Sequence, residues 1–495
     1  MANIDRERIL ASVPQRGFFG HPRGLFTLFF TEFWERFSYY GMRAILVYYM
    51  YYETTQGGLG IDQPTALAIA SIYGALVYMS GVIGGWLADR IFGASNAVFY
   101  GGILIMLGHI ALTVPGSIPM FYISMILIVL GTGLLKPNVS SIVGDLYSEK
   151  DTRRDSGFSI FYMGINLGGF LAPLATGTVG LKVGFHYGFG IAAVGMFIGL
   201  IVYMFMKKGN LGLAGTLVNN PLTNPKKTYS TILIGVAILA AIVTVGIVSG
   251  ILTINTFILL VGILGFIIPT IYFIIMYRSS KTTAVERSRI IAYIPLFIAS
   301  VMFWAIQEQG ATILASYADQ RTQLDVMGIH LSPAWFQSLN PLFIIFLAPV
   351  FAWLWMKLGT RQPTVPVKFS LGLLFAGLSF LVILIPGSLG GSEALVHPIW
   401  LVLSYLIVVL GELCLSPVGL SATTKLAPAA FASQTMSLWF LSNAAAQGLN
   451  AQLVKFYTPD NEVLYFGIFG GAALLLALVL YLSSKKIHSF MRGAD

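Results

Sequence analysis

Residues 25–52 read LFTLFFTEFWERFSYYGMRAILVYYMYY, and only four of these residues are charged. The run is longer than the roughly 20 mostly apolar residues that a helix needs to cross a bilayer. A charge in the middle of such a helix costs about 2.5–3.5 kcal/mol on insertion scales, so it normally faces protein or water instead of lipid. The run therefore predicts a membrane-spanning helix whose charged face looks into a bundle of other helices.

The charges of this run fall on one side of the predicted helix. With Glu32 taken as zero, Arg36 lies at about +40°, Arg43 at about +20°, Tyr39 at about −20° and Glu35 at about −60° around the axis. The polar face is thus roughly 100° wide, and Arg43 lies roughly 16 Å further along the axis than Glu32. We expect this face to present acids near one membrane surface and a base closer to the middle of the membrane.

The composition extends this prediction to the whole chain. Of the 495 residues, 56% are hydrophobic and 10% are charged, against roughly 45–50% and about 25% in an ordinary soluble domain. Too few charges are present to cover a soluble surface of this size. The single cysteine, Cys414, excludes an intrachain disulfide. We predict an all-α membrane protein with fourteen spans, at residues 25–52, 64–88, 94–113, 118–144, 157–180, 185–206, 229–249, 252–277, 290–316, 333–356, 369–386, 397–422, 429–454 and 463–484.

The basic residues indicate how these spans are oriented. Lys and Arg gather in cytoplasmic loops of membrane proteins. If the N-terminus is cytoplasmic, the inside segments hold 23 of the 29 Lys and Arg residues, and the outside loops hold only Lys182, Arg321 and Lys455. We therefore expect both termini in the cytoplasm of a multi-pass protein of the cell (inner) membrane. The net charge of +9 is then mostly a topology signal, and it does not indicate a nucleic-acid partner.

The loop after the second span carries a short motif, Gly85-Trp-Leu-Ala-Asp89-Arg90-Ile-Phe-Gly93. It resembles the loop motif of the major facilitator superfamily. That resemblance implies two six-helix bundles with a substrate site near the middle of the membrane. The expected bundles are residues 1–206 and 290–495. The segment between them, 207–289, contains two extra spans without charged residues, which we expect to be a peripheral, lipid-facing insert with no part in the transport pathway.

Seven charged residues fall inside the predicted spans and are the strongest functional candidates. They are Glu32, Glu35, Arg36, Arg43, Lys136, Glu308 and Glu412. Ionised together they carry a net charge of −1, which one proton would balance. Lys136 lies about as deep as Glu32, so it could pair with Glu32 or Glu35. Glu308 and Arg43 each lie about 18 residues into their spans, so a bridge between the two bundles is expected there, with Arg36 as a deeper alternative partner.

Two further strings carry a resemblance to a narrower family. These are Glu32-x-x-Glu35-Arg36-Phe-x-Tyr39-Tyr40-Gly41 and, in the fifth span, Phe161-Tyr162-Met-Gly-Ile165-Asn166-Leu-Gly168. Together they resemble the proton-dependent oligopeptide transporter family, whose bacterial members also have two extra helices between the halves. The resemblance implies a proton-coupled symporter that imports di- and tripeptides by alternating access.

The resemblance also implies roles for individual residues. The proton-coupling set would be Glu32, Glu35, Arg36, Arg43, Lys136 and Glu308. Basic groups would hold the peptide carboxylate, and an acid with amides would hold its amino terminus, while aromatic side chains would form pockets. The implied substrate-binding set is Arg36, Tyr40, Arg43, Tyr78, Lys136, Asn166, Trp304, Asn340, Glu412 and Trp439.

Other functions remain open at this point. A major facilitator transporter of another small solute, such as nitrate or a drug, would share the fold. A channel is disfavoured because no filter motif repeats. An enzyme is disfavoured because the six histidines show no metal-ligand spacing and no nucleophile stands beside a base. We therefore expect no cofactor apart from the coupling proton, and a protein that works as a monomer.

Overall fold

The computed structural model describes residues 2–148, 151–218, 221–391 and 394–494, and its long elements are all helices. Within these ranges fourteen helices have at least 18 residues, and each coincides with one predicted span. They are α2 (Arg23–Tyr51), α3 (Gln63–Leu87), α4 (Ala94–Leu112), α5 (Ile118–Asp145), α6 (Arg154–Lys182), α7 (Phe185–Asn210), α8 (Pro225–Val248), α9 (Ile254–Arg278), α10 (Ala284–Gln307), α12 (Leu339–Leu358), α13 (Val365–Gly390), α14 (Ile399–Leu426), α15 (Ala432–Leu453) and α16 (Glu462–Met491).

Twelve segments of the described chain are long and apolar enough to cross a membrane by composition alone. The two long helices outside that set are α2, which carries five charged residues, and α15, which is rich in Ser, Asn and Gln. Both helices bury polar side chains, among them Glu35 and Arg36 on α2 and Asn443 and Gln447 on α15. Lys150, one of the loop lysines that set the expected orientation, lies outside the described residues.

One predicted span is broken, and the break is at a candidate residue. The span expected at 290–316 ends as α10 at Gln307 and continues through a 3₁₀ turn, Glu308–Ala311, into the short helix α11 (Ile313–Gln320). The sequence Gln-Glu-Gln-Gly across the break is polar and contains a glycine, so it favours a turn over a continuous helix. Glu308 therefore lies at the end of a helix instead of within one.

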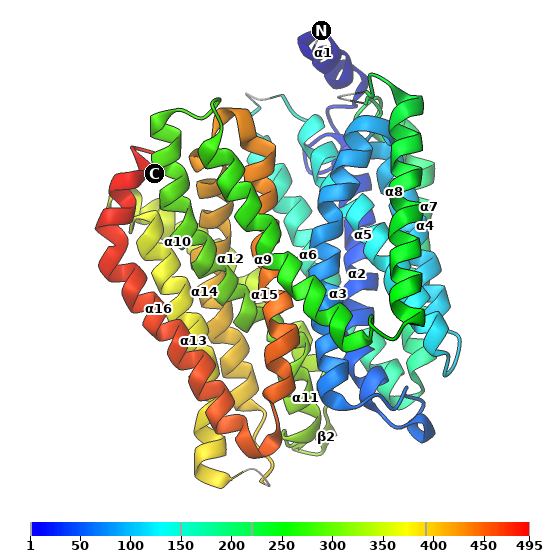
Figure 1. The fold of residues 1–495 in the computed structure, drawn as a ribbon, viewed down its shortest axis with the longest axis vertical. Coiled ribbons are helices and arrows are strands. Elements are labelled where there is room, and N and C mark those ends of the chain that lie inside the picture. The colour runs from blue at the N-terminus through cyan, green and yellow to red at the C-terminus, as the bar shows by residue number, and fades with distance from the viewer. Residues whose placement is uncertain (1, 149–150, 219–220, 392–393, 495) are drawn as a thin grey trace.

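Two sets of helices make up the body (Figure 1). Helices α2 to α7 pack against one another, with α2 against α6 and α7 and with α4 against α5, and we call residues 23–210 the first half. Helices α10 to α16 pack similarly, with α13 against α14 and α16, and we call residues 284–491 the second half. The halves meet mainly where α3 packs on α15 and α6 packs on α12. The predicted bundle limits at 206 and 290 stay a prediction.

The two ends of the helical body carry different elements. The N-terminal helix α1 (Ala2–Ser12) and the last turns of α16 lie at the upper end in Figure 1, which we call the terminal end. The opposite, distal end holds α11 and a two-stranded hairpin formed by β1 (Asp325–Val326) and β2 (Ile329–His330). The helices run between these two ends, so a solute that crosses the protein passes from one end to the other.

Glycine allows the closest helix approaches. A Cβ atom added to Gly84 of α3 would lie 1.9 Å from the carbonyl oxygen of Gly133 on α5, so nothing larger than glycine fits there without moving a helix. A Cβ atom on the neighbouring Gly85 would meet nothing within 4 Å. On α6, a Cβ atom on Gly168 would lie 2.5 Å from the carbonyl oxygen of Phe33 on α2. This approach presses α6 against the polar face of α2.

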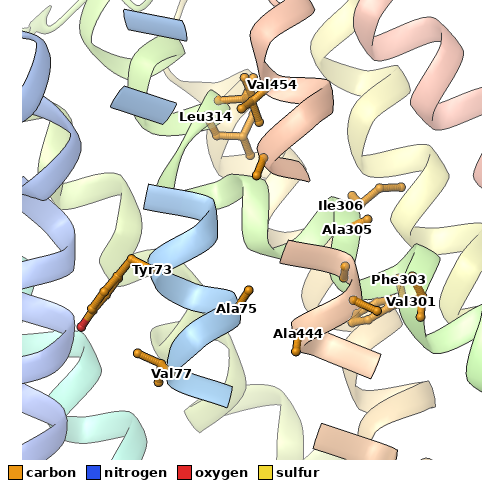
Figure 2. Packing of buried hydrophobic residues seen from close by; sticks show 14 of the residues in the cluster. Tyr73, Ala75, Val77, Val301, Phe303, Ala305, Ile306, Leu314, Ala444 and Val454 are labelled. Carbon is orange, nitrogen blue, oxygen red and sulfur yellow. The ribbon is translucent and has the colours of Figure 1, made fainter. Parts of the chain in front are cut away.

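The junction between the halves is largely apolar. Figure 2 shows Ala75 of α3 on the side of that helix that faces the second half, where Ala305 of α10 and Ala444 of α15 lie, and Val77 on the opposite side of α3. All four side chains are at most 4% exposed. Polar groups inside this junction are therefore surrounded by apolar packing, which makes their pairing energetically important.

The insert behaves only partly as predicted. Every described residue of α8 is exposed or nearly so, in agreement with a lipid-facing helix. Helix α9, however, packs against α15 of the second half and α3 of the first. Gly262 and Gly265 permit this, because Cβ atoms there would lie 3.1 Å and 3.3 Å from carbonyl oxygens of α15. α9 thus packs on both halves with one face and leaves its other residues exposed, so α8 is surrounded by lipid more completely than α9, and a place for the insert outside the transport pathway stays a prediction.

Candidate functional site

The polar face of α2 begins with a buried group of three charges. Glu32, Glu35 and Arg36 are each at most 2% exposed. The Arg36 guanidinium donates through Nη2 to Glu35 Oε1 at 2.6 Å and through Nε to Glu35 Oε2, and its Nε lies 3.3 Å from Glu32 Oε1. Glu32 Oε2 is buried without a hydrogen-bond partner among the described residues. One base thus serves two acids, and one carboxylate oxygen is left for a proton or another donor.

Lys136 does not pair with these acids, and that prediction is wrong for this conformation. Its ammonium lies 4.7 Å from the centre of the Tyr78 ring, a cation–π contact between α5 and α3. The two acids are taken by Arg36, because a guanidinium on the same helix, one turn from Glu32, reaches both without crossing between helices. Lys136 is therefore a cation without a carboxylate within salt-bridge distance in the described chain, and its side chain is partly exposed.

The predicted bridge between the halves is present. Arg43 Nη2 forms a salt bridge with Glu308 Oε2, with the two side chains 16% and 7% exposed. Two amides of α15 complete the surroundings of the carboxylate: Asn443 Nδ2 donates to Oε1 at 2.9 Å, and Gln447 Nε2 donates to Oε2 at 2.8 Å. Three donors thus hold Glu308 as an acceptor. Neither amide was predicted, although their i, i+4 spacing places both on one face of a polar helix and was a usable signal.

Glu412 of α14 also accepts hydrogen bonds from two amides, but both amides bond to the same carboxylate oxygen. Gln307 Nε2 donates to its Oε2 at 2.9 Å, and Asn340 Nδ2 donates to the same oxygen at 3.2 Å. The other oxygen, Oε1, accepts no hydrogen bond from the described residues, and the side chain is 9% exposed. The predicted neighbourhood of Glu412 and Asn340 is therefore present. Gln307, one residue before Glu308, was not predicted.

The remaining candidates differ in surroundings. Tyr40 is partly exposed, with the Arg36 guanidinium carbon 5.9 Å from its ring centre. Asn166 is 6% exposed and donates to the Tyr162 carbonyl of its own helix at 2.9 Å. Trp304 is partly exposed beside Phe303, whereas Trp439 is 6% exposed.

Trp439 is packed within the second half. A Cβ atom on Gly419 of α14 would lie 2.2 Å from the Trp439 ring, so the indole fills the space that this glycine leaves. Packing alone accounts for its position, and a role for Trp439 in binding substrate stays a prediction.

Taken together, the first half offers cations and the second half offers an acid. Arg36 and Lys136 lie on α2 and α5, and Glu412 lies on α14 with one oxygen open. Arg43 and Glu308 join the halves. Among the described residues no three His, Cys, Asp or Glu side chains are grouped so that they could hold a metal ion. The arrangement can bind a molecule with a negative and a positive pole.

Comparisons with known proteins agree with this chemistry. The family model described as the POT family matches residues 95–481. The chain belongs to the POT family. The predicted resemblance is thereby confirmed, and the family is one of transporters.

Relatives match this POT chain along its whole length. It is 65% identical to an uncharacterized transporter, YclF, of Bacillus subtilis, over 100% of both chains. It is 46% identical to a di-/tripeptide transporter of Lactococcus lactis subsp. cremoris, over 96% of this chain and 98% of that protein.

Solved structures match as closely. A crystal structure of a peptide transporter POT in complex with sulfate superposes with a TM-score of 0.96 at 73% identity, covering 99% of this chain and 100% of the other. A POT family transporter in complex with 5-aminolevulinic acid gives a TM-score of 0.93 at 47% identity, over 97% and 99%. The predicted fold class is confirmed: this is an all-α membrane protein of the major facilitator fold, two six-helix bundles with two additional helices.

Proposed function

We propose that this POT protein is a proton-coupled symporter that imports di- and tripeptides by alternating access. The observation that carries the proposal is the opposition of charges across the junction of the halves. Lys136 and Arg36 belong to the first half, and Glu412, with one free carboxylate oxygen, belongs to the second. A short peptide is a zwitterion whose two termini match these poles. Relatives that are named di-/tripeptide transporters support the same cargo.

The proposed binding mode assigns the termini of the peptide. The peptide carboxylate lies toward Lys136, Arg36 and Arg43, and the ammonium donates to Glu412 Oε1. Gln307 and Asn340 hold the other oxygen of Glu412, so the carboxylate is oriented before the peptide arrives. Tyr40, Tyr78, Asn166, Trp304 and Trp439 then contact the backbone and the side chains of the peptide. Because every short peptide has the same termini, this mode predicts broad tolerance for side chains.

Proton coupling is proposed to act through Glu308. As a carboxylate, Glu308 accepts from Arg43, Asn443 and Gln447, and the Arg43 contact crosses between the halves. A proton on Glu308 removes the charge that holds Arg43 and takes away one acceptor position. Arg43 is then free to bind the peptide carboxylate, and the halves lose a contact that keeps them together. Glu32 and Glu35, held by Arg36, are the proposed inner proton acceptors.

The setting of this activity is also proposed. The protein lies in the cell (inner) membrane with the terminal end in the cytoplasm, which the distribution of Lys and Arg supports. Both poles of the site come from one chain, which supports a functional monomer. The cargo is moved between residues 1–206 and 290–495, and protons are the only co-substrate.

Counterflow with purified protein in liposomes tests the cargo. Vesicles loaded with unlabelled dialanine take up labelled dialanine from outside without any gradient. We expect dialanine and trialanine to compete, and nitrate and free alanine to fail. The matched control is dialanine with an acetylated amino terminus, which lacks the ammonium. Absence of dialanine exchange, together with competition by nitrate or a drug, would assign the protein to the other transporters of this fold.

A further inference from the structure

The distal end contains a carboxylate that the proposed peptide site does not use. Asp319 is on α11, the short helix that follows the break after α10. Its Oδ2 accepts a hydrogen bond from the Tyr51 hydroxyl at 2.6 Å, and its Oδ1 accepts one from the Tyr52 hydroxyl at 2.7 Å. Tyr51 is the last residue of α2 in the first half and Tyr52 follows it directly, whereas Asp319 belongs to the second half. Each oxygen of the carboxylate therefore depends on the other half for its donor.

The partners of this carboxylate, which is partly buried, are both neutral. No Lys, Arg or His of the described chain lies within salt-bridge distance of Asp319. Two phenols replace a cation. Both oxygen–oxygen distances lie within the range of about 2.5–2.7 Å that is typical of a hydroxyl donating to an ionised carboxylate. Hydrogen bonds of this kind are about twice as strong as those between neutral groups. Asp319 is thus held by two strong, directional contacts across the junction.

Neighbouring contacts reinforce the same junction. The Tyr48 hydroxyl, on a fully buried side chain, donates to the Ala315 carbonyl of α11 at 3.0 Å. On α3, Gln63 bonds to the Ser316 hydroxyl, and its Oε1 accepts from Gln320 Nε2 at 3.1 Å. α11 is eight residues long, yet four of its residues bond to the first half. An isolated helix of this length is only marginally stable, so the bonds to the first half contribute more to the stability of α11 than its own backbone hydrogen bonds do.

These contacts continue the bridge at Glu308. Along α2 the donors Arg43, Tyr48 and Tyr51 follow one another, and along the second half their acceptors Glu308, Ala315 and Asp319 follow in the same order. The segment 308–319 therefore lies beside α2 and is tied to it at both ends. Release of Glu308 alone leaves the distal tie in place.

We propose that Asp319, Tyr51 and Tyr52 form a distal clamp, a second tie that must open each time the substrate site faces the distal side. This rests on the alternating-access part of the proposed function and is independent of the cargo and of the coupling ion. In the closed clamp both carboxylate oxygens are bonded to phenols. When the distal end opens, Asp319 separates from both tyrosines and is bonded by water instead. The strength of the clamp thus sets how often the site is open to the distal side.

Distance measurements between spin labels test the clamp directly. Labels are placed on Thr55→Cys, in the loop after α2, and on Leu464→Cys, which is 63% exposed at the distal start of α16. Cys414 is 3% exposed and is replaced by serine as a precaution. In Tyr51→Phe/Tyr52→Phe both rings stay and only the hydroxyls are lost. We expect the ratio of distal-open to distal-closed molecules to rise at least tenfold, equivalent to about 1.4 kcal/mol.

Two control experiments distinguish loss of the clamp from a general disturbance of the fold. Tyr187→Phe removes a hydroxyl from a side chain that is 66% exposed at the distal end of α7, and it should leave the distances unchanged. In an Asp319→Asn background the two Tyr→Phe changes should alter the ratio less than threefold, because the charged acceptor is already gone. Unchanged distances in a folded Tyr51→Phe/Tyr52→Phe protein would overturn the clamp, and so would an equal effect with and without Asp319. Because no peptide or proton gradient enters the experiment, failure of peptide transport leaves this result interpretable.

Discussion

Replacement of Glu412 by glutamine keeps the shape of the side chain and removes its charge. In the structure, Gln307 and Asn340 both donate to Oε2, so Oε1 is the oxygen left for a ligand. The glutamine carbonyl can still accept hydrogen bonds from these amides. The change therefore tests the charge at the proposed ammonium site and disturbs the surrounding packing little.

The size of the effect follows from where Glu412 lies. Its side chain is 9% exposed, so the effective dielectric constant around it lies between that of bulk water and that of a dry protein interior. Two unit charges about 4 Å apart attract by about 4 kcal/mol at an effective dielectric constant of about 20. The single carbonyl oxygen of the glutamine stays with Gln307 and Asn340, so the NH2 group in place of Oε1 cannot accept from the ammonium, and water recovers only part of the attraction. About 2–4 kcal/mol should therefore be lost. We predict that the dissociation constant of dialanine rises about 30- to 700-fold.

The assay is equilibrium binding of labelled dialanine to purified protein, with competition by dialanine and by its N-acetylated form. The acetylated peptide has no ammonium, so Glu412→Gln should change its affinity by less than threefold. Peptide affinity can also fall because a variant is partly misfolded, and the acetylated ligand controls for this. Equal losses for both ligands would refute the placement of the amino terminus at Glu412.

Three other changes probe the scaffold. Gly84→Ala pushes a Cβ atom toward the backbone of α5, an overlap that typically costs about 1–3 kcal/mol, and it should lower the thermal unfolding midpoint. Glu462→Gln breaks the buried pair with Arg321, whose Nη2 lies 2.7 Å from Glu462 Oε1, and it should destabilise the protein by about 3–5 kcal/mol in thermal or chemical unfolding. His21 should make the protein less stable as pH falls below about 6.5. Burial, followed by the nearby Arg153, lowers the pKa of this side chain in the folded protein, so the unfolded chain takes up a proton first.

Each of these has a matched comparison. Gly85→Ala adds the same methyl group one residue away, where nothing lies within 4 Å, and should leave the midpoint unchanged. An Arg321→Gln/Glu462→Gln double variant should be less destabilised against unfolding than Glu462→Gln, since no unpaired buried charge remains. The stability difference between the wild type and His21→Asn should be largest above pH 6.5 and smaller at pH 5.5. A difference that grows as pH falls would contradict the sign of the His21 shift.

The helices and the long-range charge bridge were predictable because their signals are local and strong. An apolar run of about 20 residues has few alternatives to a membrane helix, and each of the fourteen runs contains one long helix. Arg43 and Glu308 could be matched because both lie about 18 residues into spans that run in the same direction. Depth along the membrane is thus readable from sequence when two spans are roughly straight.

Pairing within the membrane was less predictable. Lys136 and Glu32 lie at matching depths, but depth does not say how far apart two side chains lie in the plane of the membrane. In the structure Arg36 pairs with Glu32, and Lys136 contacts Tyr78 instead. Asp319 was overlooked because its predicted span ended at residue 316, so it counted as a loop acid, whereas α11 continues to Gln320. Asn443, Gln447 and Gln307 were missed because neutral amides leave no charge signal, although they are the donors that orient Glu308 and Glu412.

The most direct test of proton-driven peptide uptake uses purified protein in liposomes. Accumulation of labelled dialanine is followed with no gradient, with an inward proton gradient, and with that gradient plus a negative-inside potential. The wild type should concentrate dialanine only when protons are driven inward. Glu308→Gln should abolish accumulation and keep dialanine counterflow, because the amide retains the site but cannot carry the proton. Accumulation by Glu308→Gln at the wild-type level, or accumulation by the wild type without any gradient, would contradict coupling through Glu308.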